Sequence, residues 1–202
     1  MKTSISITNH IFSLYDKHGS NQYDGEEITQ LQHMCQAGEL AEAKGFDAEI
    51  ILSAFLHDIG HICASQQQEN SMNGFGTLHH ELIGAAFLQE NGFSKRLINL
   101  VLNHVNAKRY LTFKDPEYYR KLSLASKETL KHQGGKMNAA EAATFEADPL
   151  HKIMIALRLI DEQAKDVNKP IAGLEKYRQL MKTHLQQQLN LNNKSDDTIS
   201  SI

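Results

Sequence analysis

Residues 47–61 read DAEIILSAFLHDIGH, an acidic residue and an apolar run followed by His57, Asp58, Gly60 and His61. Asp47 is a good helix N-cap, and the apolar residues behind it predict a buried helix that ends at the His–Asp pair. A carboxylate buried there without compensation would cost several kcal/mol, and a metal ion is its natural partner. The stretch therefore predicts both a core helix and a pair of metal ligands.

The rest of the chain repeats this pattern of capped apolar helices. One helix is expected over 24–44, ending at Lys44–Gly45, and a last one begins near Gly173 and fades after Leu191. Residues 66–73 are expected to form a loop. Further helix starts are predicted at Thr77, Ser94, Asp115–Pro116, Asn138 and Asp148–Pro149.

No segment alternates as a strand does, and there is no repeat or Gly/Ser linker. Only 3 prolines occur in 202 residues, which favours long helices. We predict an all-α fold with a single domain over residues 1–191, followed by a polar C-terminal tail, 192–202, that frays.

Composition argues against several classes of protein. Lys and Arg total 21 and Asp and Glu total 24, and a net charge of −3 does not suit a nucleic-acid or membrane-surface protein. No apolar run approaches the ~18 residues of a membrane span, and we expect no signal peptide. The 2 cysteines form no CxxC pair, so a reduced, cytoplasmic setting is expected.

Other candidate ligands lie on separate predicted helices, each on or beside an apolar face. They are His33, His80, His104 and Asp161. A single histidine on such a face is usually a core residue, but packing does not explain all four residues together with the His–Asp pair. Imidazole and carboxylate donors suit two transition metals such as Fe, Mn or Zn, and the lack of Cys ligands argues against structural zinc. Asp58 could bridge the two ions.

The order H…HD…H…H…D resembles the HD-domain superfamily, and the chain is more narrowly similar to its mixed-valent diiron oxygenases. The likeness covers roughly residues 20–185. It rests on YDGEEITQLQH (23–33), AFLHDIGH (54–61), HELIGAAFL (80–88), HVNAKRYL (104–111), LSLASKETL (122–130), QGGKM (133–137) and RLIDE (158–162). The HD pair alone is shared with many phosphohydrolases; Tyr23, Glu26 and the HVNAKRY segment are far more specific.

The resemblance implies an HD-domain helical bundle that holds two Fe ions in a mixed-valent Fe(II)/Fe(III) state. It assigns one iron to His33, His57, Asp58 and Asp161, and the other to His80, His104 and the bridging Asp58. In that family a tyrosine at the position of Tyr23 occupies the open iron site until substrate displaces it. The glutamate at the position of Glu26 then engages the substrate amine.

The spacing of other residues is consistent with this assignment. Tyr23, Glu26 and His33 are spaced +3 and +7, so a helix or its entering turn would put them on one stripe. Lys108 lies four residues after His104, where it would point at whatever the second iron binds, and a cation there suits a phosphonate dianion. His61, one turn past His57, is similarly placed. The matched positions imply that Ser126 and Gln133 also bond phosphonate oxygens. Arg158 and Lys165, three residues before and four after Asp161, are placed to support the ligands from behind.

The implied reaction is O2-dependent cleavage of the C–P bond of a 2-amino- or 2-trimethylammonio-1-hydroxyethylphosphonate. It would yield glycine or glycine betaine plus phosphate, in organophosphonate catabolism. A carboxylate attracts either cation; the tyrosines at 110, 118 and 119 could add cation–π contacts for the methylated one. The alternatives are an HD-type metal-dependent phosphohydrolase, an inositol-oxygenase-like diiron enzyme, and a catalytically inactive HD module for binding or regulation.

Overall fold

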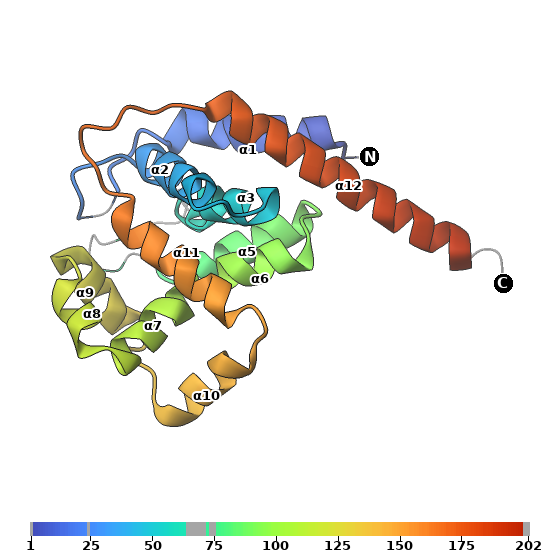
Figure 1. The fold of residues 1–202 in the computed structure, drawn as a ribbon. Helices are drawn as coiled ribbons and strands as arrows, with labels where there is room; N and C mark the ends of the chain where they lie inside the picture. Colours follow the sequence, from blue (N-terminus) through green and yellow to red (C-terminus); the bar gives the residue numbers. More distant parts are fainter. Residues whose placement is uncertain (1, 24, 64–71, 73–75, 200–202) are drawn as a thin grey trace.

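The computed structural model describes residues 2–23, 25–63, 72 and 76–199, with side chains to residue 193, and these form helices joined by loops (Figure 1). The helices are α1 (Ser4–His18), α2 (Gln30–Ala43), α3 (Ala48–Leu56), α4 (Ile59–Cys63), α5 (His80–Glu90), α6 (Lys95–Leu102), α7 (His104–Lys114), α8 (Pro116–Lys121), α9 (Leu124–His132), α10 (Ala139–Ala147), α11 (His151–Gln163) and α12 (Leu174–Ile199). The all-α prediction is confirmed. The loop expected over 66–73 lies, apart from Met72, outside the described residues.

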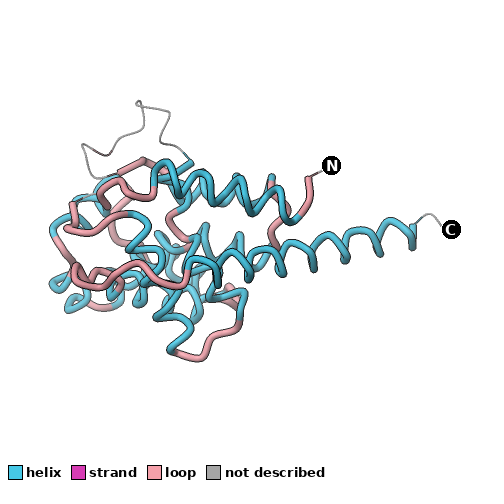
Figure 2. The backbone as a smooth tube through the Cα atoms, turned by 90° about the horizontal axis from the view of Figure 1, so that it is seen from above, coloured by secondary structure: helices cyan, strands magenta, loops and turns pink. Residues whose placement is uncertain are grey.

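The centre of the bundle is built on α3, the helix predicted from residues 47–61. It packs against α2 and α6, while α11 crosses α2 and α7, and α1 and α12 lie side by side over one face (Figures 1 and 2). Phe55 of α3 is fully buried and stacks on Tyr177 of α12, with ring centroids 4.2 Å apart. Burial of such aromatic rings is the main favourable term that holds the outer helices on the core.

Most predicted helix ends are confirmed. Asp47, Ser94, Asp115 and Asn138 each cap a helix through the side chain, as their sequence context indicates. The cap predicted at Thr77 is wrong, because α5 begins at His80 behind a left-handed residue. The start predicted at Asp148–Pro149 is also wrong, because Asp148 accepts from the nitrogen of Leu150 and α11 begins only at His151.

The helix expected from residue 24 begins instead at Gln30, with Thr29 as its cap. Gly25 takes a positive φ of 78°, and a β-bridge joins Gln22 to Thr29, so the preceding segment forms a tight turn. This turn carries two of the predicted site residues, Tyr23 and Glu26.

The α4 and α5 helices approach unusually closely at Gly60. A Cβ on Gly60 would overlap the carbonyl oxygen of His80 and lie 2.9 Å from the backbone nitrogen of Gly84. Glycine is therefore required for this contact, which brings the His–Asp segment against the start of α5.

At both ends of the chain the structure contains more helix than the sequence predicts. The pattern Ile7, Ile11, Phe12 and Tyr15 buries one face of α1, a helix that the sequence analysis did not predict. The α12 backbone continues past Leu191 to Ile199, since 192–199 contain neither Gly nor Pro to end it (Figure 1). The domain boundary at residue 191 stays a prediction.

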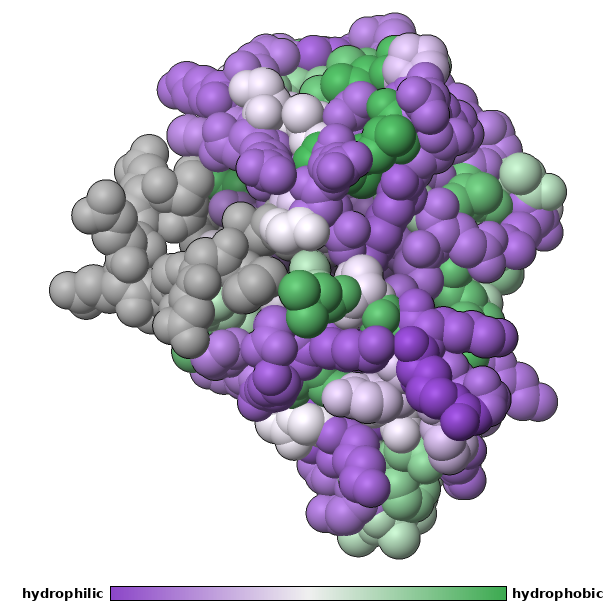
Figure 3. All heavy atoms as spheres, turned by 90° about the vertical axis from the view of Figure 1, so that its left-hand side faces the viewer, coloured by the Kyte–Doolittle hydropathy of each residue, from purple (hydrophilic) through white to green (hydrophobic). Residues whose placement is uncertain are grey.

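The outer surface is largely polar on the side that carries α8 and α9. Figure 3 shows apolar side chains there only in small groups among polar ones, outside the grey residues. Within the described part of the chain, every helix is too short or too polar to cross a bilayer.

Candidate metal centre

The His–Asp pair lies at the break between two helices. α3 ends at Leu56, His57 is its C-cap, and α4 begins at Ile59. His57 and Asp58 are 4% and 2% exposed, because the apolar α3 carries its end into the core. Since the helix is interrupted, His57 and His61 do not share one helical face. His61 instead stacks on His80, with ring centroids 4.0 Å apart.

Four buried histidines have one ring nitrogen bonded to a backbone carbonyl. His33 Nδ1 lies 2.9 Å from the oxygen of Ala164, and His57 Nδ1 lies 2.8 Å from that of Ala54. Nδ1 of His80 and of His104 contacts the carbonyl oxygens of Thr77 and Val101, at 3.1 and 2.7 Å respectively. A carbonyl only accepts, so each Nδ1 carries the proton and each Nε2 is left with a lone pair.

These Nε2 atoms face one another in pairs. The Nε2 atoms of His33 and His57 are 3.1 Å apart, and those of His80 and His104 are 2.9 Å apart. Two unprotonated nitrogens at that distance repel unless a cation lies between or beside them. A carbonyl on the other nitrogen is also the usual arrangement behind a metal-bound histidine. The donor set therefore fits two metal ions.

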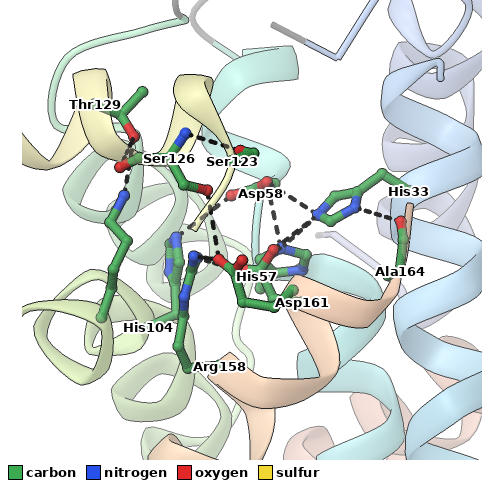
Figure 4. Close-up of polar contacts among 12 residues, drawn as sticks. His33, His57, Asp58, His104, Ser123, Ser126, Thr129, Arg158, Asp161 and Ala164 are labelled. Carbon is green, nitrogen blue, oxygen red and sulfur yellow. Dashed lines mark hydrogen bonds and ion pairs between the residues drawn. The ribbon is translucent and has the colours of Figure 1, made fainter. Parts of the chain in front are cut away.

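Asp58 connects the two histidine pairs, and Figure 4 shows it between His33 and His57 on one side and His104 on the other. Its Oδ2 lies 3.5 Å from His33 Nε2 and 3.3 Å from His57 Nε2. Its Oδ1 lies 3.4 Å from Nε2 of both His80 and His104. One carboxylate thus offers one oxygen to each pair, which is the geometry of a bridging ligand.

Asp161, at the end of α11, completes the first pair only. Its Oδ1 is buried, and no donor in the described chain forms a hydrogen bond to it, although His33 Nε2 is 3.3 Å away. Its Oδ2 pairs with Arg158. A buried carboxylate oxygen without a donor is a costly arrangement that a cation would relieve.

The charges of the centre follow from its burial. Burial raises the pKa of Asp58 and of Asp161, but His57 and Arg158 respectively bring both pKa values well below the ordinary one. Burial lowers the pKa of His57, but Asp58 raises it well above its usual value. The carboxylates are therefore ionised and attract a cation to the Nε2 side of the histidines, where a second proton on His57 takes this place in the absence of metal.

The two positions are unequal. Two histidines and two carboxylate oxygens surround the first, whereas two histidines and one carboxylate oxygen surround the second. His61 lies beside the second position, and atoms of Asp58, His61 and His80 come within 4.8 Å of one another. The second position therefore has more room for a further ligand.

A pocket opens onto this centre. All the predicted catalytic and substrate-binding residues line it: Tyr23, Glu26, His61, Lys108, Ser126 and Gln133. They share its wall with Thr129, Arg158 and Lys165. The structure thus brings the predicted ligands and the predicted substrate residues together, from a turn and six helices.

Tyr23 reaches the pocket from the turn before α2 and not from a helical stripe. Its ring stacks on His33, with centroids 4.0 Å apart and planes inclined by 15°. Burial, followed by the negative charge of Asp58, raises the pKa of its hydroxyl well above the ordinary value. Tyr23 therefore covers one ligand of the first position as a neutral phenol.

Lys108 is a cation with little compensation. Its side chain is buried, and its ammonium donates to the Thr129 hydroxyl at 3.0 Å. It forms no ion pair with a carboxylate of the described chain. Burial, and then the nearby Arg158, lower the pKa of Lys108 well below its ordinary value. Such a group is suited to receive an anion.

Some pocket residues were assigned differently or missed. Thr129 was not predicted, although it lies on the face of α9 that carries Ser126. Arg158 and Lys165 line the pocket itself. Of the tyrosines considered for cation–π contacts, Tyr118 bonds Arg158, Tyr110 bonds Glu146, and Tyr119 lies under Lys127 in another groove.

Comparison with known proteins agrees with this geometry. Residues 30–153 match the family described as HD domain. An uncharacterised protein (L432) of Acanthamoeba polyphaga mimivirus is 44% identical over 94% of this chain and 87% of its own length.

Two named relatives are enzymes. A [1-hydroxy-2-(trimethylamino)ethyl]phosphonate dioxygenase (glycine-betaine-forming) of Leisingera caerulea is 42% identical over 79% of this chain and 81% of its own length. A hydroxymethylphosphonate dioxygenase of Gimesia maris is 36% identical over 87% of each chain. This chain therefore belongs to the HD-domain family and, within it, to the oxygen-dependent oxidoreductases that these relatives represent.

Proposed function

We propose that the protein is a diiron dioxygenase that cleaves the C–P bond of a small 1-hydroxyphosphonate. The observation that carries this proposal is the pairing, in one pocket, of a bridged two-metal donor set with a buried lysine that forms no ion pair with a described carboxylate. The names of the two enzyme relatives support a phosphonate as the anion.

The donor atoms divide as the resemblance implies. His33, His57, Asp58 and Asp161 would hold one iron, and His80, His104 and Asp58 the other. When bound, the two irons supply the binding of O2 and the one-electron steps that no side chain can perform. The second position, beside His61, has room for a further ligand.

The pocket wall can hold the phosphonate. Lys108 would exchange its Thr129 contact for a phosphonate oxygen and so neutralise part of the dianion. Ser126 and His61 line the same pocket, and Gln133, which also lines it, would donate to a phosphonate oxygen through its amide nitrogen. Displacement of Tyr23 from above His33 would open the centre to the substrate.

Another part of the pocket wall suits a positively charged nitrogen. Glu26 lies there, with its Oε1 accepting from Ser123 at 2.7 Å and from Lys165 at 2.8 Å. Among the described residues, Tyr23 is the one aromatic side chain of Phe, Tyr or Trp type that lines the pocket, and it stacks on His33. A trimethylammonium group is usually held by several aromatic faces. The geometry therefore favours a primary ammonium, and we propose 2-amino-1-hydroxyethylphosphonate as the substrate.

The reaction balances with dioxygen as its only co-substrate. 2-Amino-1-hydroxyethylphosphonate and O2 together contain the atoms of glycine and phosphoric acid. C1 is oxidised to a carboxyl group, the C–P bond breaks, and both atoms of O2 enter the products. The reaction thus predicts a small-molecule substrate and O2 as partners; a cytoplasmic location remains a prediction.

The test is phosphate release by iron-loaded protein under 18O2 and, separately, without oxygen. We expect oxygen-dependent release of phosphate with glycine, and 18O from the gas in the products. Release of betaine from the trimethylammonio analogue alone would overturn the choice of substrate. Phosphate release that continues without oxygen, and that carries no 18O when 18O2 is present, would overturn the oxygenase proposal and favour the phosphohydrolase.

A further inference from the structure

The carboxylate proposed to bind the substrate nitrogen already has an ammonium partner. Lys165 Nζ lies 2.8 Å from Glu26 Oε1, and both side chains are 17% exposed. Ser123 donates to the same oxygen. Sequence reasoning placed Lys165 behind the ligands, but it lines the pocket together with Glu26.

Lys165 is held in place through its neighbours in the chain. The carbonyl of Ala164 accepts from His33, and Gln36 bonds both the nitrogen and the carbonyl oxygen of Asp166, at 2.9 and 2.8 Å. The backbone on each side of Lys165 is therefore tied to α2. This fixes the distance from its Cα to Glu26, so the ion pair is a built feature of the pocket.

The terminal group of Lys165 is chemically the same as the end of a 2-aminoethyl substrate. Both are a CH2–NH3+ group that approaches a carboxylate by hydrogen bonds. Ser126 Oγ lies 3.5 Å from Nζ and offers a second partner on the pocket wall. Two ammonium groups at one carboxylate repel, so a substrate ammonium that takes Glu26 must move Lys165 away.

We propose that Lys165 is a specificity-determining residue that neutralises Glu26 when the substrate carries no cation and competes with the substrate when it does. The inference rests on the proposed function. With Lys165 in place, the pocket can bind a phosphonate without a nitrogen, because the negative charge of Glu26 is neutralised. Without Lys165, Glu26 would repel such an anion, and the pocket would bind only a phosphonate that carries an ammonium group.

The test compares two ligands on anaerobic, iron-loaded protein, where binding occurs without turnover. The dissociation constants of 2-amino-1-hydroxyethylphosphonate and hydroxymethylphosphonate are measured by calorimetry for the wild type and for Lys165→Met. We expect the ratio of the two constants to shift toward the amino ligand by at least about tenfold. Lys169→Met removes a lysine that pairs with Glu39 away from the pocket, and this control should leave the ratio unchanged.

A second substitution separates charge from structure. Adding Glu26→Gln to Lys165→Met should restore binding of hydroxymethylphosphonate, because the uncompensated carboxylate is gone. A merely structural role for Lys165 would weaken both ligands by the same factor, with no restoration by Glu26→Gln, and that result would overturn the inference. If the wild type binds neither phosphonate, the proposed function fails as well. Binding with the expected shift but no oxygen-dependent phosphate release would refute only the reaction.

Discussion

Replacing Gly60 with alanine should push α4 away from α5 and damage the metal centre. The added Cβ would overlap the His80 carbonyl oxygen and lie 2.7 Å from the His80 carbonyl carbon and 2.9 Å from the Gly84 nitrogen. All of these atoms belong to the backbone, so no side-chain rotation relieves the overlap. Ordinary contact begins near 3.4 Å, and relieving the overlap with the His80 oxygen requires the two backbones to separate there by about 1.5 Å.

The cost of this separation can be estimated from the contacts that it breaks. Overpacking a core usually costs about 1–3 kcal/mol, and a clash between two backbones belongs at the upper end, about 3 kcal/mol. The same movement carries His80 away from Asp58, whose facing atoms are 3.4 Å apart. We therefore expect the second metal position, formed by His80, His104 and Asp58, to lose its ion first.

Urea unfolding and metal content per chain measure both effects. Gly84→Ala is the matched control, because its Cβ would meet a methyl group of Ile59 at 3.1 Å and the Gly60 nitrogen at 3.2 Å, contacts that a small shift relieves. It should change stability by no more than about 1 kcal/mol and keep both ions. A Gly60→Ala protein as stable as the control, with two ions per chain, would refute the reasoning.

Four further predictions follow from single side chains. Asp58→Ala should abolish binding of both metals, measured as metal per chain, and retention of two active irons would contradict the bridge. Glu26→Ala should raise KM for the amino substrate at least about tenfold without changing iron content. Lys108→Met should stabilise the fold by about 1–2 kcal/mol, because a buried cation without an ion-pair partner is removed, while abolishing phosphonate binding. The pKa of Lys108 is lower in the folded than in the unfolded protein, so the free energy of unfolding of the wild type rises with pH relative to that of the variant. The extra stability of Lys108→Met, measured by urea unfolding, should therefore vanish above about pH 10. Burial raises the pKa of Asp47, but the hydrogen bonds from Arg96 hold that pKa below its ordinary value. The ionised carboxylate therefore stabilises the fold above about pH 4, and this stabilisation is lost as the pH falls through the pKa of Asp47 in the folded protein. Asp47→Asn keeps a good cap, so it should cost less than about 1 kcal/mol at pH 7 and nothing in acid, whereas a constant difference would contradict the ion pair.

Local sequence signals predicted the helices well where a cap and an apolar face coincide. Asp47 and Ser94 are examples, since each is followed by apolar residues at helical spacing. Local signals failed where tertiary packing determines the backbone conformation. The start of α5 is set by the left-handed residue before His80 and by the close approach of Gly60, and neither has a local signature.

The metal ligands could be selected from the sequence because buried ionisable residues are rare. Each of the six lies on or beside an apolar face, and burial without compensation would be too costly. The sequence could not show how they divide. Only the folded chain places the two oxygens of Asp58 toward different histidine pairs and leaves Asp161 to one of them.

By itself the sequence determined the all-α class, the buried His–Asp helix end and the set of residues able to bind metal, because periodicity, caps and burial are written along the chain. Only the tertiary structure decided that Tyr23 and Glu26 reach the pocket from a turn. It also decided that Lys165 forms an ion pair with Glu26, whereas Lys108 forms none with a carboxylate of the described residues. These are contacts between residues up to 139 positions apart. No local pattern encodes such contacts, because they depend on how α2, α7, α9 and α11 pack around one another.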